Sequence, residues 1–404
     1  MNKSTLEADA ANKPIILIAT LYYLPGYRAG GPIKSIANLI SEFKDEFDFY
    51  ILTSDRDVGD SSPYGAISHN GWTQVEFAKV YYLNVAQITF KNIFTIIQIL
   101  KPHVIYLNSF FDPIFTHRIL WLFFLKKLAN IPIVIAPRGE FSLGALASKS
   151  WKKIPFIFIS KKIGLFKKLI WQASSQLEMD QILNVMGKIA RNRDVMVAPD
   201  LVAKVKINSS CSNFYRKVGQ PLKVCFLSRI VPAKNLKFAL EVLKNVDAEI
   251  LFNIYGPVED AGYWDGCKAL ISKLPSCIQV SYHGSVEPKE IEKVFGENDL
   301  FFLPTKGENF GHVIQEALAS GLPVLISDQT PWGWVVEKGV GWAFSLKGTE
   351  DFVRVLEECA HGWSEEKWRN TSIHVKKVLE CVESREKVLK QNRELFNRAI
   401  LYNQ

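Results

Sequence analysis

The sequence predicts two doubly wound α/β domains in tandem. At 404 residues the chain is longer than one ordinary hydrophobic core supports, which favours two domains. Short, continuously apolar segments alternate with segments of helical periodicity, a pattern typical of parallel sheets covered by helices on both faces. The polar stretch 206–221 interrupts this alternation, which then starts again, and is therefore the expected linker.

The first domain is expected over residues 14–205. It opens with the apolar run 14–20, which is typical of a strand, and the segment 33–43 has the periodicity of a helix. Residues 1–13 contain no apolar run or cleavage signature, so we expect a disordered tail and not a signal peptide. The other elements expected here are strands over 47–54, 103–109 and 131–137 and a helix over 117–130.

The second domain is expected over residues 222–384. Its helices are predicted at 235–246 and 312–320, and its strands at 222–229, 248–256, 278–284, 299–305 and 323–328. A charged helix over 385–404 would follow and pack back on the first domain. Sheets of this kind bind ligands beyond the carboxyl ends of their strands, so the cleft between the domains is the expected site.

Composition excludes several classes of protein. The longest apolar segment, Ile119–Leu125, is far shorter than the roughly 20 residues of a membrane span. The six cysteines have neither CxxC nor His/Cys ligand spacing, which predicts reduced thiols and no zinc site. No GxGxxG follows the first strand of either half, which disfavours a dinucleotide-dependent dehydrogenase.

The basic residues are unevenly distributed. Residues 1–205 hold 24 Lys and Arg against 16 Asp and Glu, whereas residues 206–404 hold 25 of each. The excess peaks at 149–168, where seven lysines and no acid are interleaved with Ile, Phe and Trp. One interpretation is peripheral contact with an anionic membrane, at about 1 kcal/mol for each basic residue. The other is a solvated helix whose apolar side is core. No zinc-finger, RNP-type or helix-turn-helix pattern supports nucleic-acid binding.

Two glutamates in the stretch "GENFGHVIQE" are candidates for ligand binding. Eight residues at 100° each overshoot two helical turns by about 80°, so Glu308 and Glu316 cannot share a helix face. Glu308 is expected in the loop before the helix, and Glu316 about 9 Å or more further along, inside it. Backbone amides at Asn309–Gly311 lie between them, at a helix N-terminus that favours an anion. The ligand should have hydroxyl groups at both ends and an anion in the middle, as a nucleotide sugar has.

Cations and glycines follow other strands. Arg229 and Lys234 lie on either side of the loop after the strand 222–229 and could clasp a diphosphate without a metal, although such spacing also arises by chance. Gly30 and Gly31 would let the backbone approach a phosphate, or form a simple tight turn. Gly256, which ends the strand 248–256, is a further candidate in the donor site. A last pair, Arg138 and Glu140, faces the same cleft or forms a salt-bridged loop.

Taken together, these motifs resemble glycosyltransferase family 4, whose GT-B architecture has two facing Rossmann-like domains. The stretch 307–316 resembles the E-x7-E motif of that family, "SRIVPAKNL" its Arg and Lys clasp, and "AGGP" its glycine loop. "WQASSQLEMDQI" and "VMVAPDLV" resemble two further stretches at the end of the first domain. The resemblance covers about residues 14–345.

The resemblance implies transfer of a sugar from a nucleotide diphosphate donor, with retention of anomeric configuration and without a metal or other cofactor. Arg229 and Lys234 would stabilise the departing diphosphate, Glu308 would bind the hydroxyl groups of the donor sugar, and Glu316 those of the ribose. The remaining donor contacts it implies come from Asn309, Phe310 and Gly311 and, on the opposite domain, from Gly30 and Gly31.

The chain departs from the family at two positions. Arg138 stands where many members have a histidine near the donor sugar. Arginine stays protonated and cannot act as a base, so we expect Arg138 to be a third catalytic cation on the diphosphate. Asp200 stands where an asparagine is common, and little is expected from that change.

The function expected from these residues is transfer of a hexose to a hydroxyl of a lipid-linked or polysaccharide acceptor in cell-surface glycan (polysaccharide or lipopolysaccharide) biosynthesis, at the cytoplasmic membrane face. No residue selects the nucleotide; family frequency favours UDP, with GDP-mannose as the alternative. Another GT-B enzyme, such as a nucleotide-sugar 2-epimerase or a sugar phosphorylase, and a non-catalytic nucleotide-sugar-binding partner stay open.

Overall fold

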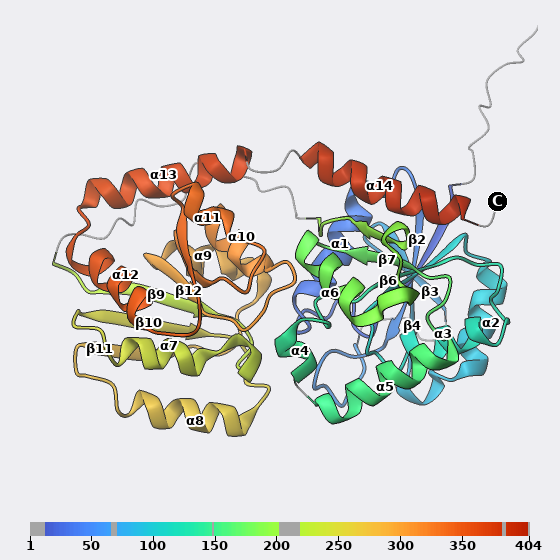
Figure 1. Cartoon of the computed structure of the whole chain (residues 1–404), viewed down its shortest axis with the longest axis horizontal. Helices are drawn as coiled ribbons and strands as arrows, with labels where there is room; N and C mark the ends of the chain where they lie inside the picture. Colours follow the sequence, from blue (N-terminus) through green and yellow to red (C-terminus); the bar gives the residue numbers. More distant parts are fainter. Residues whose placement is uncertain (1–12, 66–70, 148, 202–218, 382–384, 403–404) are drawn as a thin grey trace, which may run out of the picture.

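A computed structural model describes residues 13–65, 71–147, 149–201, 219–381 and 385–402. Two α/β domains lie side by side, each built on a predominantly parallel sheet with helices on its faces (Figure 1). This confirms the predicted fold class. The expected tail falls almost entirely outside the described residues, as does most of the expected linker 206–221.

The first domain contains an eight-stranded sheet of order β3-β4-β2-β1-β5-β6-β7-β8. Its described pairings are parallel except for β3 with β4, an antiparallel pair at the edge of the sheet. The strands are β1 Ile15–Ala19, β2 Asp48–Ser54, β3 Trp72–Val75, β4 Ala78–Leu83, β5 Val104–Asn108, β6 Ile133–Ala136, β7 Ile170–Ala173 and β8 Val195–Val197. The helices are α1 Gly31–Phe43, α2 Phe90–Leu100, α3 Thr116–Phe124, α4 Leu143–Ala147, α5 Ser150–Ile163 and α6 Gln176–Met186.

The second domain contains a six-stranded sheet of order β11-β10-β9-β12-β13-β14, and its described pairings are all parallel. The strands are β9 Leu222–Leu227, β10 Ile250–Tyr255, β11 Ile278–Tyr282, β12 Leu300–Leu303, β13 Val324–Ser327 and β14 Gly341–Phe344. The helices are α7 Leu236–Leu243, α8 Ala261–Ile271, α9 Ile291–Gly296, α10 His312–Ala319, α11 Trp334–Glu337, α12 Glu350–His361 and α13 Glu365–Cys381.

The continuously apolar strands are buried on both faces. In β1, Ile16 and Ile18 belong to one hydrophobic core of the first domain, whereas Leu17 and Ala19 belong to the core on the other face. Successive side chains of a strand point to opposite faces, so a strand between two helical layers needs apolar residues at every position. Each large aliphatic side chain buried in this way contributes about 1.5–3 kcal/mol.

The last helix of the chain, α14 (Arg385–Leu401), lies on the first domain, although α13 before it lies on the second (Figure 1). Phe396 packs between Phe47 and Tyr106 of the first domain, with ring centroids 5.6 and 5.7 Å away. Arg393 forms an ion pair with Glu46 at 2.7 Å. The chain therefore crosses between the domains a second time after the expected linker.

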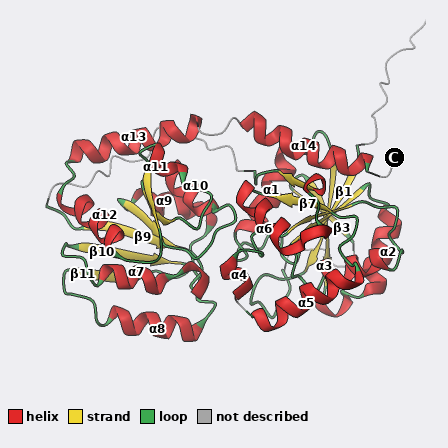
Figure 2. Cartoon of the chain, viewed as in Figure 1, coloured by secondary structure: helices red, strands yellow, loops and turns green. Residues whose placement is uncertain are grey.

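Each sheet reverses its strand order at one point, and these points position the site. β1 pairs with β2 on one side and β5 on the other, and β9 pairs with β10 and β12 in the same way. Crevices form beyond the carboxyl ends of parallel strands at such points. The loops at these strand ends lie between the two sheets, where the domains face each other (Figure 2).

Candidate active site

A cleft of about 420 Å³ lies between the domains, within the range of small-molecule sites. Its first-domain wall includes Gly30 after β1 and Arg138 after β6. Its second-domain wall includes Arg229 after β9 and Glu308 after β12. The sequence-predicted site residues all line this cleft: Gly30, Gly31, Arg138, Arg229, Lys234, Gly256, Glu308, Asn309, Phe310, Gly311 and Glu316.

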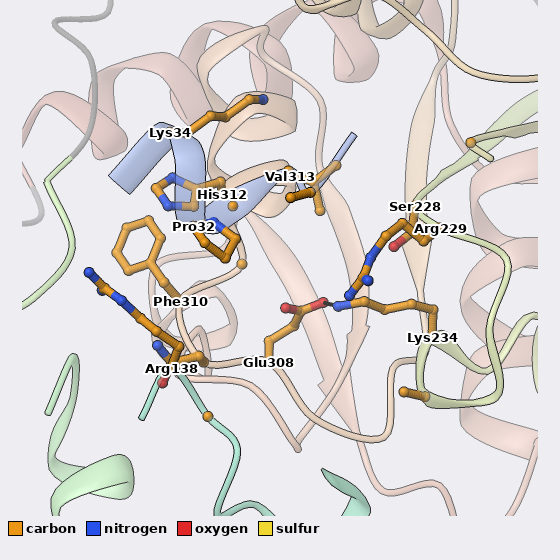
Figure 3. Close-up of a pocket in the computed structure, with 18 of the residues that line it drawn as sticks. Pro32, Lys34, Arg138, Ser228, Arg229, Lys234, Glu308, Phe310, His312 and Val313 are labelled. Atoms are coloured by element: carbon orange, nitrogen blue, oxygen red, sulfur yellow. Dashed lines mark hydrogen bonds and ion pairs between the residues drawn. The ribbon is translucent and has the colours of Figure 1, made fainter. Parts of the chain in front are cut away.

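Lys234 and Glu308 form an ion pair on the second-domain wall (Figure 3). Lys234 ends a short 3₁₀ turn after β9, and the neighbouring loop is tied to this turn because the amide of Lys306 donates to the carbonyl of Ala233 at 2.9 Å. The two charged side chains are only 15% and 11% exposed. A partly desolvated pair attracts strongly, and an incoming anion beside Lys234 would exchange one negative partner for another.

Arg229 extends from the same wall as Lys234 (Figure 3), and its guanidinium is held by Glu259 at 3.1 Å. At 45% exposure, Arg229 is the more accessible of the two cations. Gly256 packs against the backbone beside it: its φ is +132°, and a Cβ at this position would lie 1.9 Å from the carbonyl oxygen of Ser228. Only glycine fits there without moving the backbone that carries Arg229.

Glu316 lies inside α10 and forms an ion pair with Lys34 of α1, across the cleft. Gly311 precedes this helix with a φ of +83°, which lets the chain turn into α10. The carbonyl of Phe310 accepts a hydrogen bond from the Trp332 indole, which holds the Asn-Phe-Gly turn against the second domain. The two glutamates therefore line one cleft from two positions, one in a loop and one in a helix.

The glycine loop on the first-domain wall has a backbone that is accessible from the cleft. The Asp57 carboxylate accepts hydrogen bonds from the amides of Tyr27 and Arg28 at 2.8 and 3.1 Å. Gly30 then adopts a φ of +71° at the start of α1, and nothing lies within 4 Å of the position of its missing Cβ. Its backbone is thus accessible from the cleft beside the N-terminus of a 13-residue helix, which favours an anion.

Arg138 differs from the expectation of a third cation directed at the diphosphate. Its side chain extends away from Lys234 and Glu308 (Figure 3) and forms a buried ion pair with Asp200. It also donates to Asn108 Oδ1 and to the Tyr106 hydroxyl, both at 2.6 Å. Burial alone would lower the pKa of Arg138, but the adjacent Asp200 charge raises it. The charge of Arg138 is thus neutralised within the first domain.

Asp200, from which the sequence analysis expected little, joins the two domains. It accepts a hydrogen bond from Ser35 Oγ at 3.0 Å, and Ser35 Oγ lies 2.8 Å from Nε2 of His312 on α10. The Asp200 carboxylate and the Gly31 carbonyl, 3.1 Å from Ser35 Oγ, can only accept, so the single Ser35 proton is directed to these oxygens and His312 donates from Nε2. Burial lowers the pKa of His312 to about 4, against the opposing charge of Asp200, so the imidazole is neutral near pH 7.

Two buried glutamates shape the first-domain loops. Glu140 lines the cleft, but its carboxylate accepts from the amides of Phe110 and Phe111 at 2.6 and 2.9 Å. Glu178 accepts from the amides of Gly139 and Ser174 at 2.6 and 2.7 Å. Burial raises the pKa of both carboxyls, and these hydrogen bonds oppose the shift. Both side chains position loops, and Glu140 faces the cleft, as the first of the two interpretations for Arg138 and Glu140 expected.

The described residues contain no group of three or more His, Cys, Asp or Glu side chains arranged to hold a metal ion. Within the same ranges, every helix is too short or too polar to cross a membrane.

Comparison with known proteins identifies the chemistry. Residues 212–388 match the family model described as glycosyl transferases group 1. The chain is a glycosyltransferase. It is 27% identical over 275 residues to an "Uncharacterized 41.2 kDa protein in cps region" of Klebsiella pneumoniae, covering 66% of this chain and 72% of that protein. It is also 28% identical over 152 residues to the sulfoquinovosyl transferase SQD2 of Arabidopsis thaliana. This alignment covers 35% of this chain and only 28% of SQD2.

Solved structures share the fold of this glycosyltransferase. Anabaena Alr3699/HepE in complex with UDP-glucose superposes with a TM-score of 0.67 at 14% identity, covering 95% of this chain and 98% of that one. WaaG, a glycosyltransferase involved in lipopolysaccharide biosynthesis, superposes with a TM-score of 0.68 at 11% identity, covering 94% and 99%. Both likenesses support the GT-B architecture.

The cleft residues that the sequence analysis missed include Lys34, Ser35 and His312, which contact the opposite domain. A local signal existed for Lys34 and His312. Lys34 lies one helical turn after Gly30, so the same helix N-terminus that presents the glycine loop also presents its side chain. His312 directly follows Gly311 and begins the helix that contains Glu316. Their partners, however, belong to the opposite domain, and no spacing along the chain predicts that.

Proposed function

We propose that this enzyme transfers a hexose from a nucleotide-diphosphate sugar, with UDP as the nucleotide, to a hydroxyl of a lipid-linked or polysaccharide acceptor in cell-surface glycan biosynthesis. Transfer retains the anomeric configuration and uses no metal. The observation that carries the proposal is the convergence of Arg229, Lys234, Glu308 and Glu316 on one interdomain cleft. The similarity to a protein of a cps region and the fold shared with a UDP-glucose complex support the same substrate class.

The charges that develop during the reaction are complementary to the charged groups of the second-domain wall. As the anomeric C–O bond breaks, its electron pair goes to the diphosphate, and positive charge develops on the sugar ring. Lys234 and Arg229 stabilise the diphosphate, together with the amides of Phe310 and Gly311. One preorganised donor at a developing anion is worth about 3–4 kcal/mol, so two cations supply much of the acceleration.

The remaining groups orient the donor. Glu316 binds the ribose hydroxyls and Glu308 the hydroxyls of the sugar, while Gly30 and Gly31 approach the phosphates from the opposite wall. The acceptor hydroxyl attacks the anomeric carbon from the side of the leaving group. A C–O bond forms to the acceptor, and the acceptor proton passes to an oxygen of the departing diphosphate, so no carboxylate nucleophile is needed.

Nucleotide release tests the proposed function. The purified enzyme is incubated with UDP-glucose, GDP-mannose or ADP-glucose, with and without a glycan acceptor and with EDTA. We expect acceptor-dependent release of UDP that EDTA leaves unchanged, and an α-linked product from an α-linked donor by NMR. Acceptor-independent conversion of the donor to an epimer would instead identify an epimerase. Binding without any turnover would identify a non-catalytic partner.

A thermal-shift screen with the same three donors identifies the nucleotide. A ligand that binds only the folded state stabilises it by about 2.7 kcal/mol at a concentration of 100 Kd. We expect UDP-sugars to raise the melting temperature of the wild type more than GDP- or ADP-sugars do. Lys234→Ala should reduce that shift, while the exposed Lys244→Ala on the same domain should not. A larger shift with GDP-mannose would reassign the donor.

A further inference from the structure

Helix α5 presents five of its apolar residues to solvent. Trp151, Ile154 and Phe158 recur at spacings of three and four, and Ile159 and Ile163, four residues apart, widen this apolar side to about half of the helix circumference. All five side chains are exposed, Trp151 by 73% and Phe158 by 67%. A surface helix of a globular protein normally turns such a stripe toward the core. The expectation that the apolar side of this basic stretch is core is therefore wrong for these five residues.

The orientation of α5 is held from its inner side. Lys153 Nζ donates to the carbonyl of Ala145 at 2.6 Å, and Lys161 Nζ donates to the carbonyl of Val185 at 2.6 Å. Phe156 stacks on His117 of α3 with ring centroids 4.4 Å apart, and Ile157 is buried. Two lysines and these rings thus face the protein, and the apolar stripe is left outside by specific contacts.

Exposed lysines surround the stripe. Lys149, Lys152, Lys162, Lys167 and Lys168 are all exposed, and residues 149–168 contain no acidic side chain. The neighbouring α3, which Phe156 contacts through His117, ends in exposed Phe124 and Leu125 followed by two more lysines. We call the five apolar residues of the stripe and the five exposed lysines around it the α5 patch.

We propose that the α5 patch docks the enzyme on the surface of an anionic lipid bilayer, with α5 lying in the plane of the headgroups. Helices of this kind bury their apolar side at the headgroup boundary while their lysines contact anionic lipids. Charge complementarity selects this occupant. A second copy of the chain would bring one lysine cluster against another, and like charges in contact oppose such a dimer.

The patch is connected to the cleft through a short stretch of chain. Gly144 and Ala145 line the cleft, and the Ala145 carbonyl is the one that accepts from Lys153 of α5. Docking through α5 therefore places the first-domain wall next to the bilayer. If the proposed transfer is correct, a lipid-linked acceptor would reach the cleft directly from the membrane. The docking itself does not rest on that activity.

Vesicle co-sedimentation of the full chain tests the proposal. We expect binding to phosphatidylcholine vesicles that contain phosphatidylglycerol, little binding to phosphatidylcholine alone, and loss of binding in high salt. Each of Lys162→Glu and Lys167→Glu should weaken binding about fivefold or more, since each basic residue adds about 1 kcal/mol. Ile154→Glu with Phe158→Glu should abolish it.

Matched controls separate docking from folding and from catalysis. Ile99→Glu changes an apolar residue that is 75% exposed on α2 of the same domain, and it should bind vesicles like the wild type. All variants should keep the wild-type melting temperature and acceptor-dependent nucleotide release with a soluble acceptor, because the patch lies outside the cleft. Absence of binding to anionic vesicles, or binding that survives Ile154→Glu with Phe158→Glu, would overturn the proposal. So would a wild-type dimer that these two substitutions dissociate.

Discussion

The cleft has one wall from each domain, and both walls carry paired charges in different surroundings. On the second-domain wall, Lys234 pairs with Glu308 and Arg229 with Glu259, and these side chains line the cleft or are partly open to solvent. On the first-domain wall, Arg138 pairs with Asp200 in a buried position, where two further side chains also accept its hydrogen bonds.

The difference teaches that residue type does not decide whether a charge is available to a ligand. The second-domain pairs would exchange partners with the diphosphate of the proposed donor. In contrast, the first-domain pair would leave an uncompensated buried charge if it opened, which is strongly unfavourable. We therefore expect the charged residues of the second-domain wall to take part in the reaction. Those of the first-domain wall should stabilise the first domain and its contact with α10.

The largest effect should come from breaking the buried pair. Arg138→Met leaves Asp200 without its cation, and removal of one partner of a buried ion pair costs about 3–5 kcal/mol. We expect the melting temperature to fall steeply and the double variant Arg138→Met with Asp200→Asn to recover part of the loss. Thermal unfolding of the two variants beside the wild type measures this. An unchanged melting temperature, with turnover lost, would make Arg138 a ligand-binding cation after all.

In contrast to Arg138→Met, Lys234→Ala should reduce turnover much more than stability. Loss of one preorganised cation at the diphosphate should lower kcat by about 10²–10³, while the melting temperature falls much less than for Arg138→Met. Steady-state nucleotide release and thermal unfolding of the same preparations provide both values. Lys244→Ala, at the exposed residue that follows α7, is the control. Equal losses of kcat and stability would show that Lys234 is structural.

Acidification should weaken the contact between the walls through His312. Its pKa is about 4 in the folded protein against an ordinary value of 6.5, so the unfolded state takes up the proton first. Neutral His312 therefore contributes up to about 3 kcal/mol to the free energy of unfolding above pH 6.5. This contribution is lost as the pH falls toward 4. The charges of Asp200, Lys34 and Arg138 act on the imidazole ring and also influence its pKa.

His312→Gln isolates that contribution. It cannot titrate but keeps a side-chain donor, so its free energy of unfolding should fall less between pH 7 and pH 5 than that of the wild type. The buried Glu140 and Glu178 titrate in both proteins and cancel in the difference. Parallel stability curves for the two proteins would contradict the assignment.

The smallest effect is expected for the pair that spans the cleft. Lys34 and Glu316 are each about a third exposed, and such pairs are worth about 1 kcal/mol or less. Lys34→Gln frees Glu316 for the ribose, so UDP should bind up to about fivefold more tightly in a calorimetric titration. Weaker binding would mean that Lys34 itself contacts the nucleotide.

Much of the second domain was predictable from the chain. Its buried strands are short, continuous apolar runs ended by turn residues, and the predicted strand 222–229 corresponds to β9 at Leu222–Leu227. β14 was missed because its four residues are only half-buried, and β7 because the polar Gln172 interrupts its apolar run. The helix predicted over 117–130 ends at Phe124, since Lys126 adopts a φ of +58° that no helix continues.

The sequence by itself determined the fold class and the candidate residues around the strand ends, because burial of both sheet faces and the loop chemistry leave local patterns. Only the tertiary structure decided which charges pair. Arg138 meets Asp200, Lys34 meets Glu316 and His312 meets Ser35 over separations of 62 to 282 residues. It also decided that the stripe of α5 faces outward, since periodicity defines a helix face but not the side on which the core lies.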